Sequence, residues 1–204
     1  MNVITNRKEI FKYFLFYALI NALLLYYVHD LIITDPQYFT GGNARSVALY
    51  RKVWRFIYFT SPVYEFIKIT IISLLIFQAI KLFFKLKVQF LGIVYIVLLA
   101  QMLLLIPDIL ELIWFTFIKP DYSMRDVEYF SPLSLINFID HQNLSNIGYE
   151  LLRSINLFNI LYWGFIIYFI KEYVNIKMAK SVLVVFCFYG PVSFIFSFTY
   201  YFFS

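Results

Sequence analysis

The sequence predicts an all-α integral membrane protein with about five transmembrane helices and two interfacial helices. Of its 204 residues, 62% are apolar and only 14% are charged, whereas soluble domains carry about 25% charged residues. The mean hydropathy is +0.77. No polar stretch between the apolar segments is large enough for a soluble domain, so residues 1–204 are expected to form a single membrane domain.

Charge and cysteine content narrow the possible partners. Lys and Arg number 17 against 12 Asp and Glu, and in so apolar a chain this excess favours anionic lipid over nucleic acid. The single cysteine, Cys187, lies in the last apolar segment, so neither a disulfide framework nor a multi-cysteine metal site is expected. We therefore expect membrane lipids as partners, no nucleic acid, no metal and no cofactor.

The first span is predicted over about residues 10–28. It follows the basic pair Arg7 and Lys8, but its apolar core is long and lacks a small-residue cleavage site, which favours an uncleaved span over a signal peptide. Asn21 interrupts this apolar run. An asparagine inside a span is expected to hydrogen-bond a neighbouring helix rather than to bind a ligand.

An amphipathic helix is predicted over about residues 44–60. At 100° per residue its aromatic and aliphatic side chains share one side and its cations the other, which is typical of a helix lying flat in the membrane interface. Nucleic-acid binding is the rival interpretation, but the apolar side would need burial in any case. The cations expected to contact lipid phosphates are Arg45, Arg51, Lys52 and Arg55.

The second and third spans are predicted over about residues 61–84 and 88–112. Ser61 followed by Pro62 is typical of a helix start, with serine as the cap and proline in the first turn. The short basic link between the two spans requires a tight antiparallel hairpin. The third span begins with 19 uncharged residues, enough to cross roughly 30 Å of hydrocarbon, and then meets Pro107, where a kink is expected.

Two further spans are predicted over about residues 151–170 and 181–203. Before them, Ser131 and Pro132 predict the start of a second interfacial helix, over about residues 131–140, that is too short to cross a membrane. Gly190 and Pro191 predict a kink in the last span, whose freed carbonyl needs a partner in the bundle.

The distribution of cations predicts the orientation. The links after the second and fourth spans are short and rich in lysine, and Glu172 is their one acid. Short basic loops stay on the cytoplasmic side. We therefore expect a cytoplasmic N-terminus and an external C-terminus, in a bacterial cytoplasmic (inner) membrane.

Helix lengths predict a layer of charged residues near the outer ends of the spans. Counting along the hairpin from its tip at Leu86 places Lys68 and Glu65 level with residues 104 and 107, close to Asp108 and Glu111. Arg153 falls at the same level. A structural interpretation has Lys68 pairing with Asp108 to fix the register of the helices.

A functional interpretation of the charged layer is a path for protons or cations, or a metal site. Asp108 and Glu111 share a helix face near a proline, and His29 and Asp30 are expected at the same level. One histidine with scattered carboxylates does not form a recognised metal motif. The structural interpretation of the charged layer is therefore favoured over the functional one.

The sequence offers no catalytic set. A paired Ser and Lys or two intramembrane aspartates for peptide cleavage in lipid, an HExxH helix and a Gly-rich phosphate loop are all missing from it. His141, beside Asp140, is interpreted as a solvated loop histidine. The chain is therefore expected not to be an enzyme.

Several features of residues 62–203 are shared with a known family. They are five spans after a short cytoplasmic start, FSPLSLINFID (residues 130–140), SINLFNILYWGFIIY (residues 154–168) and a Lys-Ser opening of the last span. With these features the chain resembles the Yip1-like family of small polytopic membrane proteins. The outer loop is longer here, and Asn159 stands where members often have Glu or Ser. The resemblance implies a non-catalytic helper of a membrane assembly and transfers no catalytic residue.

Two functions are compatible with these features. The first is an accessory or scaffold subunit of a larger membrane protein complex, packed against another integral membrane protein. The second is a small transporter or an ion- or proton-conducting subunit that uses the charged layer. Five spans without inverted repeats favour the first.

Overall fold

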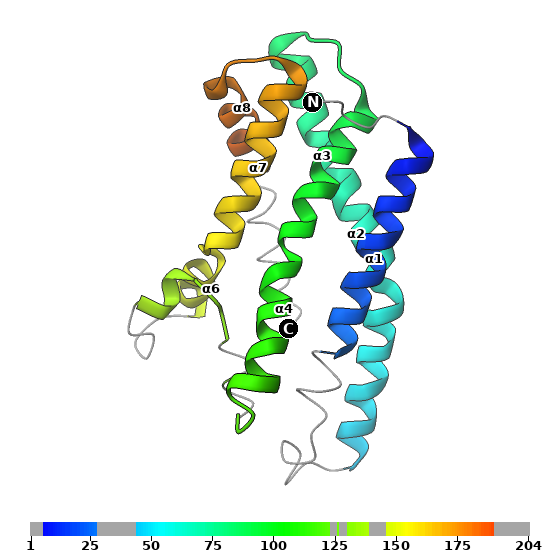
Figure 1. Ribbon diagram of the computed structural model, residues 1–204, viewed down its shortest axis with the longest axis vertical. Coiled ribbons are helices and arrows are strands. Elements are labelled where there is room, and N and C mark those ends of the chain that lie inside the picture. Colours follow the sequence, from blue (N-terminus) through cyan, green and yellow to red (C-terminus); the bar gives the residue numbers. More distant parts are fainter. Residues whose placement is uncertain (1–5, 28–43, 123–125, 127–129, 139–145, 190–204) are drawn as a thin grey trace.

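The computed structural model describes residues 6–27, 44–122, 126, 130–138 and 146–189. In these residues the fold is all-helical, with long helices that run up and down an elongated bundle (Figure 1). This confirms the predicted fold class. Four helical stretches are long and apolar enough to cross a membrane: Arg7–Tyr27, Lys52–Phe84, Phe90–Ile118 and Leu157–Val174.

Helix α2 is continuous from Ala44 to Phe84. The prediction of a separate flat helix over residues 44–60, ending before a new start at Ser61, was therefore wrong. The Ser61 hydroxyl accepts a hydrogen bond from Asn21 Nδ2 of α1 (Arg7–Tyr27) at 3.0 Å, so it links two helices instead of marking a helix start. Pro62 lies inside α2, which at about 1.5 Å per residue is roughly 60 Å long.

The predicted hairpin of the second and third spans is present. Helix α2 ends at Phe84 and α3 (Phe90–Leu103) begins after a five-residue link, and the two helices lie side by side (Figure 1). Lys85 has a φ of 51° and its N–H donates to the Lys81 carbonyl at 3.1 Å, which closes α2.

The third span is made of three consecutive segments. Helix α3 is followed by α4 (Leu105–Ile113) and by the π-helix η3 (Trp114–Ile118). Between α3 and α4 the Leu104 N–H donates to the Gln101 carbonyl, an i to i+3 bond of 3.0 Å that tightens the turn. This irregularity lies within one turn of Pro107, where a kink was expected.

The predicted interfacial helix over residues 131–140 is reduced to the short 3-10 helix η4 (Leu135–Phe138). Ser131 and Pro132 do not start a helix, and this part of the prediction was wrong. The backbone on either side of Ser134 instead bonds to the end of the next helix: the Leu135 N–H donates to the Ile155 carbonyl at 3.0 Å. The Ser134 hydroxyl also donates to the Leu152 carbonyl at 2.9 Å.

The fourth predicted span is divided in two. Helix α6 (Asn146–Ser154) projects sideways from the bundle, and α7 (Leu157–Val174) returns along it (Figure 1). The prediction of one helix over residues 151–170 missed this break. Asn156 is the N-cap of α7, since its side chain accepts from the Asn159 N–H at 2.8 Å.

Helix α8 (Met178–Val184) and the π-helix η6 (Val185–Tyr189) begin the fifth predicted span, three residues earlier than expected. The predicted kink at Gly190 and Pro191 lies outside the described residues. The most buried side chains lie where α2, α3 and α7 meet, and most are β-branched: Ile72, Ile76, Ile80, Ile93, Ile96, Ile166 and Ile170.

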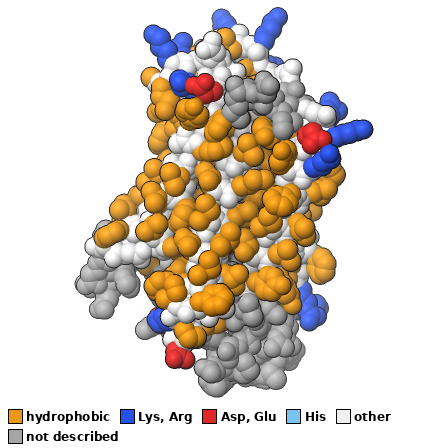
Figure 2. Space-filling model, in the orientation of Figure 1, with side chains coloured by type: hydrophobic (Ala, Val, Ile, Leu, Met, Phe, Trp, Pro, Cys, Tyr) orange, Lys and Arg blue, Asp and Glu red, His pale blue; other side chains and the backbone are white. Residues whose placement is uncertain are grey.

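Apolar side chains also cover the outside of the bundle over most of its length, and charged side chains gather toward its ends (Figure 2). A soluble protein rarely exposes apolar patches of this extent. This surface fits the hydrocarbon of a bilayer, so the chain is integrated in a membrane and its helices contact lipid.

Candidate functional site

Two buried hydrogen bonds join α1 to α2. The Tyr17 hydroxyl donates to Glu65 Oε2 at 2.7 Å, and Asn21 Nδ2 donates to Ser61 Oγ at 3.0 Å. Tyr17 is 2% exposed and Glu65 7%. On both helices the two residues are four apart, so in an antiparallel pair they form two successive rungs. The second rung confirms the interhelical role expected of Asn21.

Glu65 carries a second partner on its other oxygen. Lys68 Nζ lies 2.7 Å from Glu65 Oε1, one turn further along α2, and both side chains are mostly buried. The predicted direct pair between Lys68 and Asp108 is not formed. A lysine three residues after a glutamate reaches it within the same helix, whereas Asp108 belongs to a different helix.

Asp108 and Glu111 extend the charged layer from α2 to α4 and α6. Asp108 interacts electrostatically with Lys68, Glu65 and Tyr17. Glu111 interacts with Asp108 and with Arg153 of α6. These electrostatic interactions link five charged residues, and Glu65 and Lys68 among them form a direct ion pair. In the part of the chain that the structure describes, neither Asp108 nor Glu111 forms a hydrogen bond or a direct ion pair.

The depth of the layer follows from the helix length. Lys68 lies 16 residues before the end of α2 at Phe84, or about 24 Å along the helix. With the lysine-rich link at one face of a roughly 30 Å hydrocarbon core, Lys68 and Glu65 lie in the last quarter of that core. Removing one partner of a buried ion pair lowers the free energy of unfolding. Because Glu65 also accepts a hydrogen bond from Tyr17 of α1, this group constrains how α1 and α2 pack.

The other predicted site residues lie apart from the layer. Lys52 and Arg55 are exposed on α2, which also carries Arg45 and Arg51. Within the described residues no three His, Cys, Asp or Glu side chains are grouped as metal ligands would be. His29 and Asp30, the other members of the metal hypothesis, lie outside those residues.

Sequence analysis missed Tyr17 and Ser61. Ser61 was interpreted as the start of a helix. A signal was present, because the spacing of four residues between Tyr17 and Asn21 recurs between Ser61 and Glu65 on a neighbouring span of opposite direction. A similar polar contact joins α3 to α7, where buried Gln101 Nε2 donates to the Tyr162 hydroxyl at 3.0 Å.

Fold and site together define a polytopic, all-helical membrane protein with a charged layer inside its bundle. Comparison with protein families, with curated proteins and with solved structures gives no match to this chain. The function of this protein is therefore inferred from its own geometry.

Proposed function

We propose that the protein is a non-enzymatic accessory or scaffold subunit that packs against another integral membrane protein. The observation that supports this most directly is the length of α2. About 20 helical residues cross the hydrocarbon core, but α2 has 41. Counted back from Phe84, the core ends near Tyr64.

Two large aromatic side chains lie beyond that point. Phe59 and Phe56 precede Phe84 by 25 and 28 residues, so they lie about 38 and 42 Å along the helix. A tilt of about 20° reduces these heights only to roughly 35 and 39 Å. Phe59 is 84% exposed and Phe56 69% exposed. Measured from Phe84 in this way, both rings lie at or beyond the edge of a hydrocarbon core of roughly 30 Å, where a partner protein can cover them.

The proposed interface has the composition of a partner contact. Phe56 and Phe59 lie on one side of α2, one turn apart, with the exposed cation Arg55 beside them. Aromatic residues and arginine are enriched at protein interfaces. The resemblance of residues 62–203 to the Yip1-like family adds to this proposal, because its members are non-catalytic helpers.

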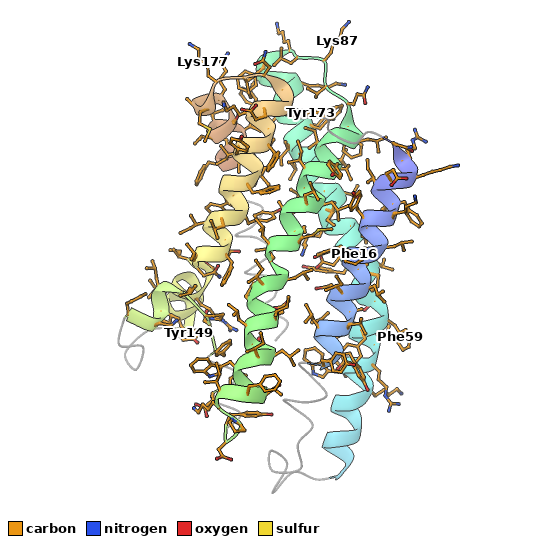
Figure 3. All side chains as sticks on the ribbon, in the orientation of Figure 1. Phe16, Phe59, Lys87, Tyr149, Tyr173 and Lys177 are labelled. Carbon is orange, nitrogen blue, oxygen red and sulfur yellow. The ribbon has the colours of Figure 1, made fainter. Side chains whose placement is uncertain are left out.

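Photo-crosslinking tests the proposal. A photoreactive phenylalanine analogue is placed at Phe59 or, as a matched control, at Phe16 of α1, which is 58% exposed and points outward from the bundle at a mid-helix position (Figure 3). In native membranes the probe at Phe59 should give a discrete protein adduct, whereas the probe at Phe16 should give lipid adducts. Lipid adducts alone at both positions would contradict the proposal.

Copurification provides the second measurement. The double variant Phe56→Ala/Phe59→Ala should lower recovery of that partner by at least about tenfold, as expected when two aromatic anchors are lost. Phe11→Ala/Phe16→Ala is the control, since both of these side chains are also exposed. Equal losses from both variants would indicate detergent effects and not an interface.

A proton- or cation-conducting subunit is the second candidate, favoured by the buried layer of Glu65, Lys68 and Asp108. Ionisable groups inside a membrane commonly mark ion pathways. The proton or cation flux measured in proteoliposomes should then fall in the Asp108→Asn variant. It should not fall in Asp121→Asn, because Asp121 is an exposed loop carboxylate. Equal flux from the wild type and from protein-free liposomes would eliminate this candidate.

A further inference from the structure

The end of the bundle that carries the two short links is a cationic surface. Lys87 and Lys177 both project from this end, although they belong to different links (Figure 3). Five lysines on it are exposed and, among the described residues, make no ion pair: Lys81, Lys85, Lys87, Lys177 and Lys180.

One contact brings the lysines of separate segments together, and a second holds Lys81 within α2. Lys180 Nζ, from α8, lies 5.1 Å from the ring centre of Phe84, at the end of α2. Lys81 Nζ lies 4.6 Å from the ring centre of Phe77, one turn further back. The end of α2 and the start of α8 are therefore neighbours. Phe84 lies between Lys85 of the α2 end and Lys180 of α8.

Almost no negative charge opposes these lysines. The one carboxylate of the two links, Glu172, is occupied by Lys171 at 2.7 Å. At the other end of the bundle, by contrast, Lys119 is paired with Asp126 at 2.6 Å. An ammonium group only donates hydrogen bonds, so the surface needs acceptors with negative charge.

The apolar flank identifies the kind of anion. Leu82 and Phe83 on α2 and Met178 and Val182 on α8 are exposed immediately beside the lysines. A ligand that contacts both the lysines and the apolar side chains has a phosphate at the level of the ammonium groups and acyl chains below it. A soluble phosphate would leave the apolar zone uncovered.

We propose that the ends of α2 and α8 form a binding site for anionic phospholipid headgroups. The lysines hold the phosphodiester, and the flanking apolar side chains contact the acyl chains. This site is separate from the proposed partner surface around Phe59. It also makes the face that carries the two links the one that meets an anionic leaflet.

Native mass spectrometry of the full-length protein tests this site. The protein is exchanged into mixed micelles with equal amounts of phosphatidylglycerol and phosphatidylcholine, and the ratio of the two retained lipids is measured. A lysine near a membrane surface contributes about fivefold in affinity for anionic lipid. Lys85→Gln/Lys180→Gln should therefore lower the phosphatidylglycerol preference by roughly 25-fold, and Lys85→Arg/Lys180→Arg should retain it.

Matched variants of the adjacent ion pair sharpen the test. Lys171→Gln removes a lysine that Glu172 already neutralises, so it should change the preference little. Glu172→Gln releases Lys171 and should raise the preference. Far-ultraviolet circular dichroism and size-exclusion elution verify that each variant is folded.

Two results would overturn the proposal. One is an unchanged lipid preference in folded Lys85→Gln/Lys180→Gln. The other is displacement of phosphatidylglycerol by millimolar pyrophosphate at constant ionic strength, which would identify the surface as a soluble-phosphate site. Loss of preference in the glutamine variant, with retention in the arginine variant, supports the lipid site.

Discussion

The hydrogen bond between Tyr17 and Glu65 is predicted to contribute more to stability than any other polar contact between α1 and α2. The Tyr17→Phe substitution removes only the hydroxyl and leaves Glu65 Oε2 buried without its donor. Hydrogen bonds to charged groups contribute about 1.5–3 kcal/mol, and cross-helix bonds in membranes average about 0.6 kcal/mol with a maximum near 1.7. We expect a loss of about 1.5–2 kcal/mol in the free energy of unfolding.

A double-mutant cycle isolates this bond. The background Glu65→Leu/Lys68→Leu replaces the ion pair with apolar side chains, a change that is often tolerated. In that background the acceptor is gone, so Tyr17→Phe should cost less than about 0.5 kcal/mol, giving a coupling energy above about 1 kcal/mol.

Unfolding in mixed micelles of dodecyl maltoside and dodecyl sulfate, followed by tryptophan fluorescence, measures these free energies. Tyr13→Phe is the control, because Tyr13 packs edge-on against Tyr95 at 5.7 Å and its ring contact survives the substitution. An equal effect of Tyr17→Phe with and without Glu65 would refute the reasoning, since the bond would then carry no energy of its own.

Two further predictions concern packing and topology. Gly92→Ala should lower the free energy of unfolding by about 1–3 kcal/mol, because the new Cβ would lie 2.3 Å from the Tyr173 hydroxyl. In Gly164→Ala the new Cβ would have no atom within 4 Å, so this substitution should be neutral or stabilising by up to about 1 kcal/mol. Thermal unfolding of the two alanine variants measures both effects. For topology, an impermeant maleimide is applied to intact cells and to inverted membrane vesicles carrying single-cysteine variants in a Cys187→Ser background. Cysteines at Lys87 and Lys177 should be labelled from the same side of the membrane, and a cysteine at Asp121 from the opposite side. Labelling of the first two from different sides would contradict the antiparallel bundle.

Hydropathy predicted most of the fold because a bilayer leaves few options. Backbone polar groups in hydrocarbon must bond internally, so long apolar segments become helices, and a short link forces two of them into a hairpin. The same constraint does not locate helix breaks. Pro62 was expected at a helix start but lies within α2. The break before α7 falls at Asn156, although residues 149–163 contain no proline or glycine.

Residue counting predicts which charged side chains lie at a similar depth, but it does not predict which of them touch. Rise per residue was enough to place Lys68 and Glu65 level with Asp108, because straight antiparallel helices preserve depth. Which charges touch depends on the rotation of each helix about its axis and on side-chain reach, which residue counting does not supply. Lys68 consequently reaches Glu65 on its own helix, and Tyr17 enters the layer from α1.

The unbroken course of α2 through Pro62 also has a mechanical consequence. A helix roughly 60 Å long behaves as a stiff rod, so a rotation of about 10° around its midpoint would shift each end by roughly 5 Å. A force applied near Phe59 would therefore reach Glu65, less than two turns away, and the lysines at the far end together. Movement of a neighbour bound at the proposed partner surface would in this way be transmitted from one side of the bilayer to the other.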